Sequence, residues 1–181
     1  MNHLLNPGGQ LGDRSWQLAR NLFMDWQDAA FLALARRDRQ CVVLANGCFD
    51  LLHAGHLWLL EWAKNLSYEF TCGYPTFVIA AANCDDGVSR LKGPGRPVVP
   101  LAQRLYALAS LKWVDCAVGF KENTPVSLLE AVRPHVLVKG SEYAEAAVVG
   151  KEYAATVVLA PMLPGVSTTL TVERMRPRST C

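Results

Sequence analysis

Apolar and polar positions alternate in blocks along this chain, and the blocks predict strands and helices in turn. Short, predominantly apolar runs are typical of parallel strands that are covered on both faces. They lie at about 41–45, 77–82, 113–118, 136–138 and 155–159. Stretches with apolar residues at helical spacing lie between and around them, at about 15–37, 54–65, 100–111, 125–132 and 168–175. This order predicts an α/β fold, a Rossmann-like open parallel five-stranded sheet with helices on both faces, in a single domain.

The same pattern divides the chain into four segments. Residues 1–13 are predicted to be a flexible lead-in, 14–39 an N-terminal helix, 40–176 the main domain and 177–181 a tail. Segments 67–76 and 83–97 are predicted loops, the second because it is rich in glycine, proline and cations. The N-terminal helix carries an apolar stripe that we interpret as a packing surface, against the domain or a second subunit; its members are Trp16, Ala19, Leu22, Phe23, Trp26, Ala30 and Leu34.

Composition narrows the class of protein. The chain has 181 residues, 51% of them hydrophobic, and a formal net charge of +2, which is too small to indicate nucleic acid or an anionic membrane as the main partner. No apolar run approaches the length of a membrane span, and the first residues lack the basic and apolar regions of a signal peptide, so we expect a cytoplasmic protein. The six cysteines form no C-x-x-C pair, which favours reduced thiols over a zinc site.

The stretch 46–56 carries the most specific chemistry. The apolar run 41–45 leads into it and a helical pattern leads out, so a strand ends, the backbone turns at Gly47, and a helix begins beside His53 and His56. Residues three apart lie on one face of a helical turn. The free N–H groups and the dipole of a helix N-terminus suit an anion such as phosphate. We interpret this stretch as a phosphate site, and together with the candidates below as the α-phosphate end of a triphosphate site. A zinc site would need a third ligand, which no nearby Cys or His supplies.

Other candidates follow other predicted strands, at the edge where parallel sheets bind ligands. Cationic side chains could neutralise phosphates, and hydroxyl groups at a helix start could bind the outer phosphates if that last loop folds back over the same edge. Asp50 could hold Mg²⁺ or could cap the following helix. The cationic and hydroxyl candidates are Lys92, Arg96, Lys139, Ser167, Thr168 and Thr169.

Asn46-Gly47-Cys48-Phe49-Asp50 with His53-Ala54-Gly55-His56 resembles the signature of the cytidylyltransferase-like nucleotidyltransferases, the H-x-G-H superfamily. The runs 90–97, 103–104, 138–143 and 164–169 are similar to those of one branch. That branch is the D-glycero-β-D-manno-heptose 1-phosphate adenylyltransferases, including the C-terminal domain of the bifunctional heptose kinase/adenylyltransferase. The resemblance covers about residues 40–176.

The resemblance implies transfer of AMP from ATP to a sugar 1-phosphate, with Mg²⁺, release of pyrophosphate and no covalent enzyme intermediate, in a homodimer. It implies that His53 and His56 stabilise the transition state and that Lys92 approaches the phosphates. It also implies a nucleotide-binding set made of Asn46, Gly47, Cys48, Phe49, Asp50, Gly55, His56, Asn83, Asp85, Arg96, Lys139, Gly140, Glu142, Ser167, Thr168 and Thr169.

Some positions depart from the pattern of that branch, and they leave the acceptor and the nucleobase open. The loop 67–76 is longer than usual, and Glu142, His135 and Val166 differ from the common residues. Two alternatives therefore stand beside the adenylyltransferase. One is a cytidylyltransferase for glycerol 3-phosphate or another small phosphate acceptor, and the other is a catalytically silent nucleotide-binding module.

Overall fold

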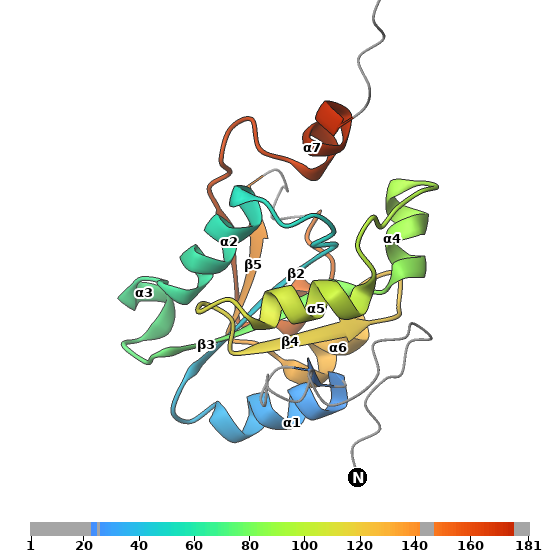
Figure 1. Ribbon diagram of the computed structural model, residues 1–181. Helices are drawn as coiled ribbons and strands as arrows, with labels where there is room; N and C mark the ends of the chain where they lie inside the picture. Colours follow the sequence, from blue (N-terminus) through green and yellow to red (C-terminus); the bar gives the residue numbers. More distant parts are fainter. Residues whose placement is uncertain (1–22, 25, 142–146, 176–181) are drawn as a thin grey trace, which may run out of the picture.

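The computed structural model describes residues 23–24, 26–141 and 147–175. Its strands form one parallel sheet in the order β1-β4-β3-β2-β5-β6 (Figure 1). The five predicted strands are confirmed, and a two-residue edge strand, β1, adds a sixth. The strands are β1 Phe23–Met24, β2 Cys41–Gly47, β3 Thr76–Asn83, β4 Cys116–Phe120, β5 Val136–Gly140 and β6 Thr156–Ala160.

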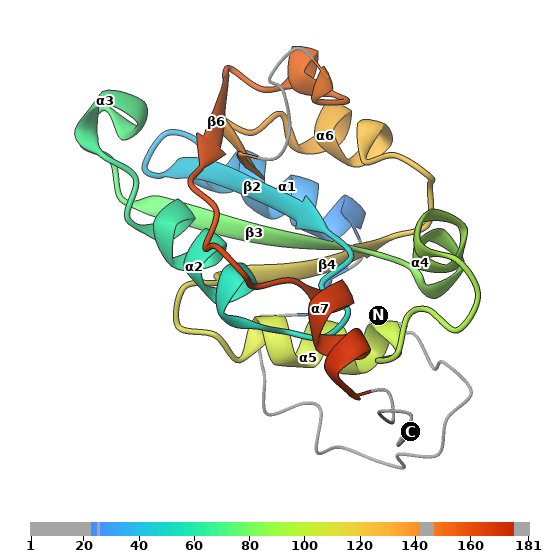
Figure 2. The same cartoon turned by 90° about the horizontal axis from the view of Figure 1, so that it is seen from above.

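Helices cover both faces of the sheet, as predicted (Figure 2). Helices α2 and α5 share one apolar core with the sheet, and α1 and α6 share the other. Because both faces are buried, the central strands are apolar at successive positions instead of alternating with polar ones. The helices are α1 Trp26–Arg36, α2 Ala54–Lys64, α3 Tyr68–Thr71, α4 Asp85–Lys92, α5 Leu101–Ala109, α6 Val126–Val132 and α7 Thr168–Met175, with a 3-10 turn, η3, at Lys151–Tyr153.

The N-terminal helix begins later than predicted. Phe23 and Met24 are extended and pair with Ala117 and Val118 of β4, and α1 begins at Trp26. Pairing satisfies backbone groups at the open edge of β4, and this outweighs the helical spacing of the apolar residues. The predicted helical residues 15–22, Trp16 among them, lie outside the described part of the chain.

The packing face of α1 also differs from the prediction. Ala29, Ala30 and Ala33 are buried, whereas Leu34 is 55% exposed and Phe31 is 76% exposed. Ala30 packs against the domain, as predicted, whereas Leu34 does not, so packing of Leu34 against a second subunit stays a prediction. Small side chains let α1 approach the sheet closely, and α1 thereby shares a core with α6 and the sheet, so it is part of the main domain.

Both predicted loops contain a helix. In the 83–97 segment, Cys84 caps α4 because its Sγ accepts from the Gly87 N–H at 3.4 Å, and Gly93 ends the helix at φ 89°. Acidic residues stand in the first turn of α4 and basic ones in the last, which suits the helix dipole. Only 93–97 is irregular. In the 67–76 segment, the single turn α3 ends at Cys72, which is left-handed at φ 51°.

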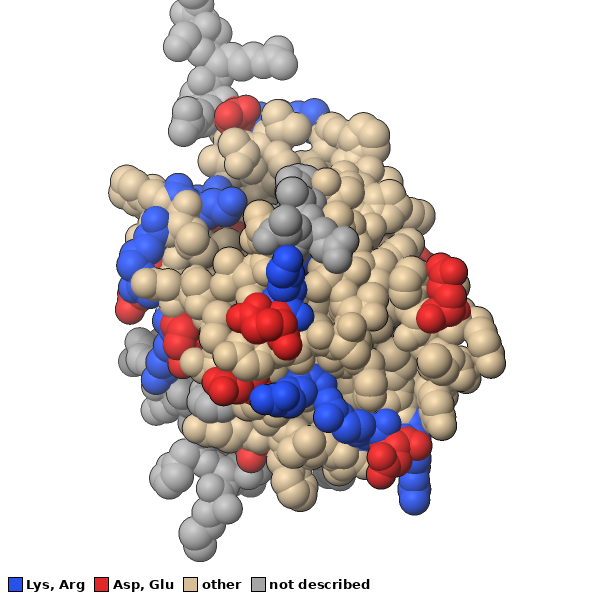
Figure 3. All heavy atoms as spheres, turned by 180° about the vertical axis from the view of Figure 1, so that it is seen from behind, with Lys and Arg blue, Asp and Glu red and all other residues tan. Residues whose placement is uncertain are grey.

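The charged surface supports no single-sign interface on the face opposite to Figure 1. Lys and Arg side chains lie interspersed with Asp and Glu among neutral residues there (Figure 3). None of the helices in the described residues has the length and hydropathy that a membrane span needs. The five cysteines of this part are free thiols.

Candidate active site

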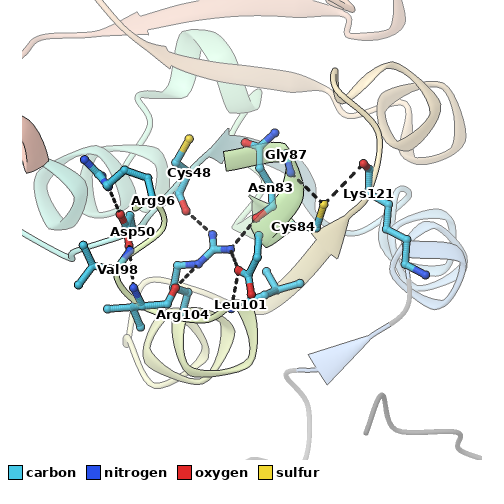
Figure 4. Close-up of polar contacts among 12 residues, drawn as sticks. Cys48, Asp50, Asn83, Cys84, Gly87, Arg96, Val98, Leu101, Arg104 and Lys121 are labelled. Carbon is cyan, nitrogen blue, oxygen red and sulfur yellow. Dashed lines mark hydrogen bonds and ion pairs between the residues drawn. The ribbon is translucent and has the colours of Figure 1, made fainter. Parts of the chain in front are cut away.

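The loop from β2 to α2 is anchored by two buried side chains. Phe49 has a left-handed backbone at φ 46° and a side chain that is 1% exposed in the core. Asp50 is 2% exposed, and its carboxylate accepts from Arg96 Nε at 2.5 Å, Val98 N at 2.7 Å and Val99 N at 2.9 Å (Figure 4). Burial raises the pKa of Asp50, but the hydrogen bonds from Val99, Val98 and Arg96 outweigh it and hold the pKa below its ordinary value.

Asp50 therefore serves neither of its two predicted roles. Both carboxylate oxygens bind the 96–99 segment, so the side chain neither caps α2 nor stands free for a metal ion. Magnesium prefers carboxylates that are open to it. No group of three or more His, Cys, Asp or Glu side chains among the described residues could hold a metal ion. The geometry does not fit a magnesium site built by the protein at Asp50.

The two histidines form a stacked pair at the start of α2. His53 is the N-cap, and its Nδ1 accepts from the Gly55 N–H at 3.1 Å. The rings of His53 and His56 lie 3.9 Å apart between centroids, with 22° between their planes. A β-carbon at position 55 would lie 3.1 Å from the His53 ring and 3.7 Å from the Val166 carbonyl oxygen. Gly55 therefore allows both the histidine and the 161–167 segment to come close.

Both histidines are neutral at pH 7. Burial lowers the pKa of His53, and burial together with His53 lowers the pKa of His56 to about 4, although the Leu51 backbone and Asp50 oppose that shift. Because Nδ1 of His53 is an acceptor, its proton lies on Nε2, which can donate to a ligand. Among the described residues, Nδ1 of His56 is buried and has no hydrogen-bond partner in reach.

Arg104 of α5 holds the surrounding segments together, and its role was not predicted. Its side chain is 1% exposed. The guanidinium donates to the carbonyl of Cys48, to the carbonyl of Asn83 at 2.8 Å and to that of Val99 at 2.9 Å (Figure 4). It also pairs with Asp85 Oδ1 at 2.7 Å. The sequence holds two signals: Arg104 is a charged residue at the helical register of Leu101, Leu105 and Leu108, and it belongs to the run 103–104 that carries the resemblance.

Three cations surround the Cys48 thiol. Burial raises its pKa, while Lys92, Arg104 and Arg96 act in the opposite direction, in that order. Lys92 is exposed at the end of α4, whereas Arg96 is tied to Asp50 through Nε. Two of the predicted cations, Lys92 and Arg96, therefore lie within electrostatic reach of Cys48 after β2, and Lys92 is more open than Arg96 to a ligand.

Side-chain alternation places the polar residues at the strand ends on one face of the sheet. Val42 and Leu44 of β2 belong to the α1/α6 core, and Val43 and Ala45 to the α2/α5 core. Asn46 continues the first series, so it points to the α1/α6 face. The same alternation places Asn83 of β3 and Lys139 of β5 on that face. The histidines lie on the other side, at the start of α2.

The 161–175 segment folds back over this edge, which was the condition set for its hydroxyl groups to join the site. Trp58 Nε1 of α2 donates to the Pro161 carbonyl at 2.9 Å. Ser167 caps α7, since its Oγ accepts from the Leu170 N–H at 3.1 Å. No residue of α7 is buried. A cavity of about 240 Å³ lies beneath it, lined in part by Leu51, Leu52, Val99, Ala107, Thr171 and Met175.

The structure thus brings most of the predicted residues to one edge of the sheet. Gly47 and Gly140 end β2 and β5 there, and Thr168 and Thr169 open α7. Glu142 lies outside the described residues. His135 lies at the opposite edge, where its Nδ1 accepts from the Val42 N–H at 2.9 Å, so its departure from the pattern does not touch the site.

Comparison with known proteins decides the class. A family model described as Cytidylyltransferase-like matches residues 44–178. The chain belongs to the cytidylyltransferase-like family. Membership confirms the predicted superfamily and the prediction of a nucleotidyltransferase-type enzyme.

Relatives of this family member include proteins named Bifunctional protein HldE. That of Acidiphilium cryptum is 50% identical over 135 residues, which cover 72% of this chain and 26% of the relative. That of Helicobacter hepaticus is 40% identical over 155 residues, covering 86% of this chain and 30% of the relative. The chain therefore spans less than a third of the length of these relatives.

Solved structures confirm the fold. A lipopolysaccharide core biosynthesis protein from Thermoplasma volcanium has a TM-score of 0.51 at 23% identity, over 67% of this chain and 95% of its own. A pantoate-beta-alanine ligase from Francisella tularensis has a TM-score of 0.52 at 14% identity, over 86% of this chain and 73% of its own. At these identities the likeness concerns the fold alone.

Proposed function

We propose that this family member transfers AMP from ATP to a sugar 1-phosphate of the heptose 1-phosphate type and releases pyrophosphate. The observation that carries the proposal is the stacked, neutral His53–His56 pair at the N-terminus of α2, where Lys92 also stands within electrostatic reach of the strand end. The resemblance to HldE proteins, at 40–50% identity, supports the choice of acceptor.

The proposed chemistry is a direct displacement. A phosphate oxygen of the sugar 1-phosphate attacks the α-phosphorus of ATP, the bond to the bridging oxygen breaks, and pyrophosphate leaves with the electron pair. His53 Nε2–H donates to oxygens on which charge develops, and a ring that is neutral at pH 7 keeps one proton for this purpose. Lys92 and Lys139 offset the charge of the phosphates, and the N–H groups at the start of α7 bind the outer ones.

Mg²⁺ enters the proposal only as the companion of the triphosphate. It prefers phosphate oxygens, water and one or two carboxylates. Since Asp50 is fully engaged by Arg96 and two amides, no step is assigned to a metal held by this chain.

A pyrophosphate-release screen tests the function. ATP, CTP, GTP and UTP are each combined with heptose 1-phosphate, other sugar 1-phosphates and glycerol 3-phosphate. We expect the highest kcat/KM for ATP with heptose 1-phosphate. A preference for CTP with glycerol 3-phosphate would replace the proposal by the cytidylyltransferase alternative. A rise in Tm with ATP but no turnover with any acceptor would favour the silent module.

The homodimer and the cytoplasmic location remain proposals. The exposed Phe31 and Leu34 of α1 offer an apolar surface for a second copy. The mass of the protein in solution tests this, and a monomer at micromolar concentration would contradict it.

A further inference from the structure

Asn46 has a buried polar atom that nothing in the described structure satisfies. Its Oδ1 is inaccessible to solvent and has no hydrogen-bond partner among the described residues. An unpaired buried oxygen is costly, so such groups are rare in native proteins and each one needs an explanation. A ligand that donates a hydrogen bond to Oδ1 would supply that explanation.

The direction of Asn46 separates it from the histidines and from the start of α7, which are proposed to bind the triphosphate. The histidines and the start of α7 lie by α2, whereas Asn46 points to the α1/α6 face of the same strand end. In a displacement at the α-phosphorus, the attacking and leaving oxygens lie on opposite sides. With pyrophosphate on the α2 side, the acceptor approaches from the side of Asn46.

The chemistry of the neighbouring side chain fits a sugar phosphate. In the parallel pairing of β2 with β5, Ala45 stands beside Val138, so Asn46 stands beside Lys139, on the same face. A cation suits the phosphate group. An amide oxygen suits a donor, which a phosphate anion lacks and a hydroxyl group has. Adjacent strands are about 4.8 Å apart, a spacing that matches a sugar's phosphate and a hydroxyl near it.

We propose that Asn46 is a specificity residue for the acceptor: its Oδ1 accepts a hydrogen bond from a sugar hydroxyl near the phosphorylated carbon, the hydroxyl at carbon 2 being the first candidate. This inference rests on the proposed function. It differs from the nucleotide-binding role that the resemblance implies for Asn46, because it assigns the side chain to the acceptor and not to ATP.

The test measures kcat/KM for heptose 1-phosphate and for its monodeoxy analogues, in the unchanged chain and in Asn46→Ala. We expect the 2-deoxy analogue, or another analogue that lacks a hydroxyl near carbon 1, to lose about tenfold or more in the unchanged chain. In Asn46→Ala, kcat/KM should be nearly the same for heptose 1-phosphate and for this analogue, because the oxygen that accepts from the hydroxyl group is absent. The KM for ATP should stay the same.

Two control variants distinguish a change in acceptor specificity from a general effect on the structure. Asn46→Asp retains an acceptor oxygen, so it should keep the discrimination between the hydroxyl and deoxy sugars, even if a negative charge near the phosphates lowers both rates. Asn65→Ala removes an amide at the far end of α2, where Asn65 donates to the Glu61 carbonyl at 2.8 Å, and should change neither ratio. The Tm of ligand-free Asn46→Ala should equal or exceed that of the unchanged chain, since an unsatisfied oxygen is removed.

The outcomes separate the two proposals. If no sugar 1-phosphate supports turnover of the unchanged chain, the proposed function fails. If heptose 1-phosphate is a substrate but Asn46→Ala raises the KM for ATP, or leaves the loss for every deoxy analogue intact, the assignment of Asn46 is wrong while the function stands.

Discussion

The floor and the cover of the site are built in opposite ways. The floor is the network that Arg104 makes with Cys48, Asn83, Asp85 and Val99, and its guanidinium is almost entirely buried. The cover is the 161–175 segment, in which α7 buries no residue. A fixed floor holds the reacting groups in place before substrate arrives, whereas a loosely packed cover can be reordered by it. Substrate binding can therefore reorder the cover while the Arg104 network of the floor stays unchanged.

Breaking the floor should have the largest effect. Arg104→Met leaves three carbonyl groups without this donor, while the half-exposed Asp85 keeps the Leu101 N–H, and we expect the free energy of unfolding to fall by about 3–5 kcal/mol. Urea denaturation monitored by circular dichroism measures it. Arg104→Lys keeps the positive charge, but its ammonium group cannot reach all four acceptors as the planar guanidinium does. The free energy of unfolding should therefore fall by an intermediate amount. A loss below about 1 kcal/mol in Arg104→Met would show that the network does not hold the floor.

The histidines stand between floor and cover, and their removal should affect turnover more than folding. We expect kcat to fall by about 10²–10³ in His53→Ala, because it removes the Nε2–H donor to the transition state, and to fall also in His56→Ala, because that ring stacks on His53 and holds it in place. The unfolding free energy at pH 7 should change much less than in Arg104→Met. Steady-state kinetics on the proposed substrates, with denaturation of the same samples, measures both. Unchanged kcat in either variant would contradict the assigned role.

The floor could not be predicted in the way that the strands and the histidines were. Continuous apolar runs suffice to predict buried parallel strands, and H-x-G-H is a local pattern, because one helix turn brings His53 and His56 together. Arg104 is bound by Val99 and by groups from two other segments, Cys48 after β2 and the stretch from Asn83 to Asp85, and these segments meet only in the folded structure. Asp50 is similar: its partners at 96–99 are distant in sequence, so its spacing from the helix indicated a cap or a metal ligand instead.

The boundaries of helices were predicted wrongly for a related reason. The glycines and prolines of 93–97 predicted an irregular segment, but α4 is complete before them because Cys84 and the charged residues at its two ends stabilise it. In α1, the helical spacing predicted a stripe that packs against the domain or a second subunit, and the close approach to the sheet buries the alanines while Leu34 is exposed.

Acid should weaken the fold through the histidines. Their lowered pKa values mean that the folded chain favours the neutral rings, so the unfolded chain binds more protons between pH 6.5 and about 4. The stabilisation is complete above about pH 6.5 and is lost as the pH falls toward 4. For His56 alone the loss is up to about 3 kcal/mol. Urea denaturation at several pH values measures it.

His56→Gln sharpens this prediction. The variant has no titrating ring at position 56, so it should lose less stability than the unchanged chain between pH 6.5 and 4.5. His135 lies at the opposite edge of the sheet and has a lowered pKa of its own. His135→Gln should therefore remove a separate part of the dependence of the unfolding free energy on pH. An acid loss that is identical in His56→Gln and in the unchanged chain would contradict the burial of that ring.

Loosening the cover should have the smallest effect on stability. Trp58→Phe removes the hydrogen bond to the Pro161 carbonyl and leaves the floor intact, so we expect a loss below about 1 kcal/mol. Hydrogen exchange should nevertheless accelerate in 161–175, and the KM for ATP should rise several-fold, roughly the effect of one such bond, if the cover binds the outer phosphates. Trp62→Phe is the matched control: Trp62 lies one turn further along α2, packed against the core, so its loss should lower stability without changing exchange in the cover. Equal exchange rates in Trp58→Phe and the unchanged chain would show that other contacts hold the cover, and that floor and cover differ less than their burial indicates.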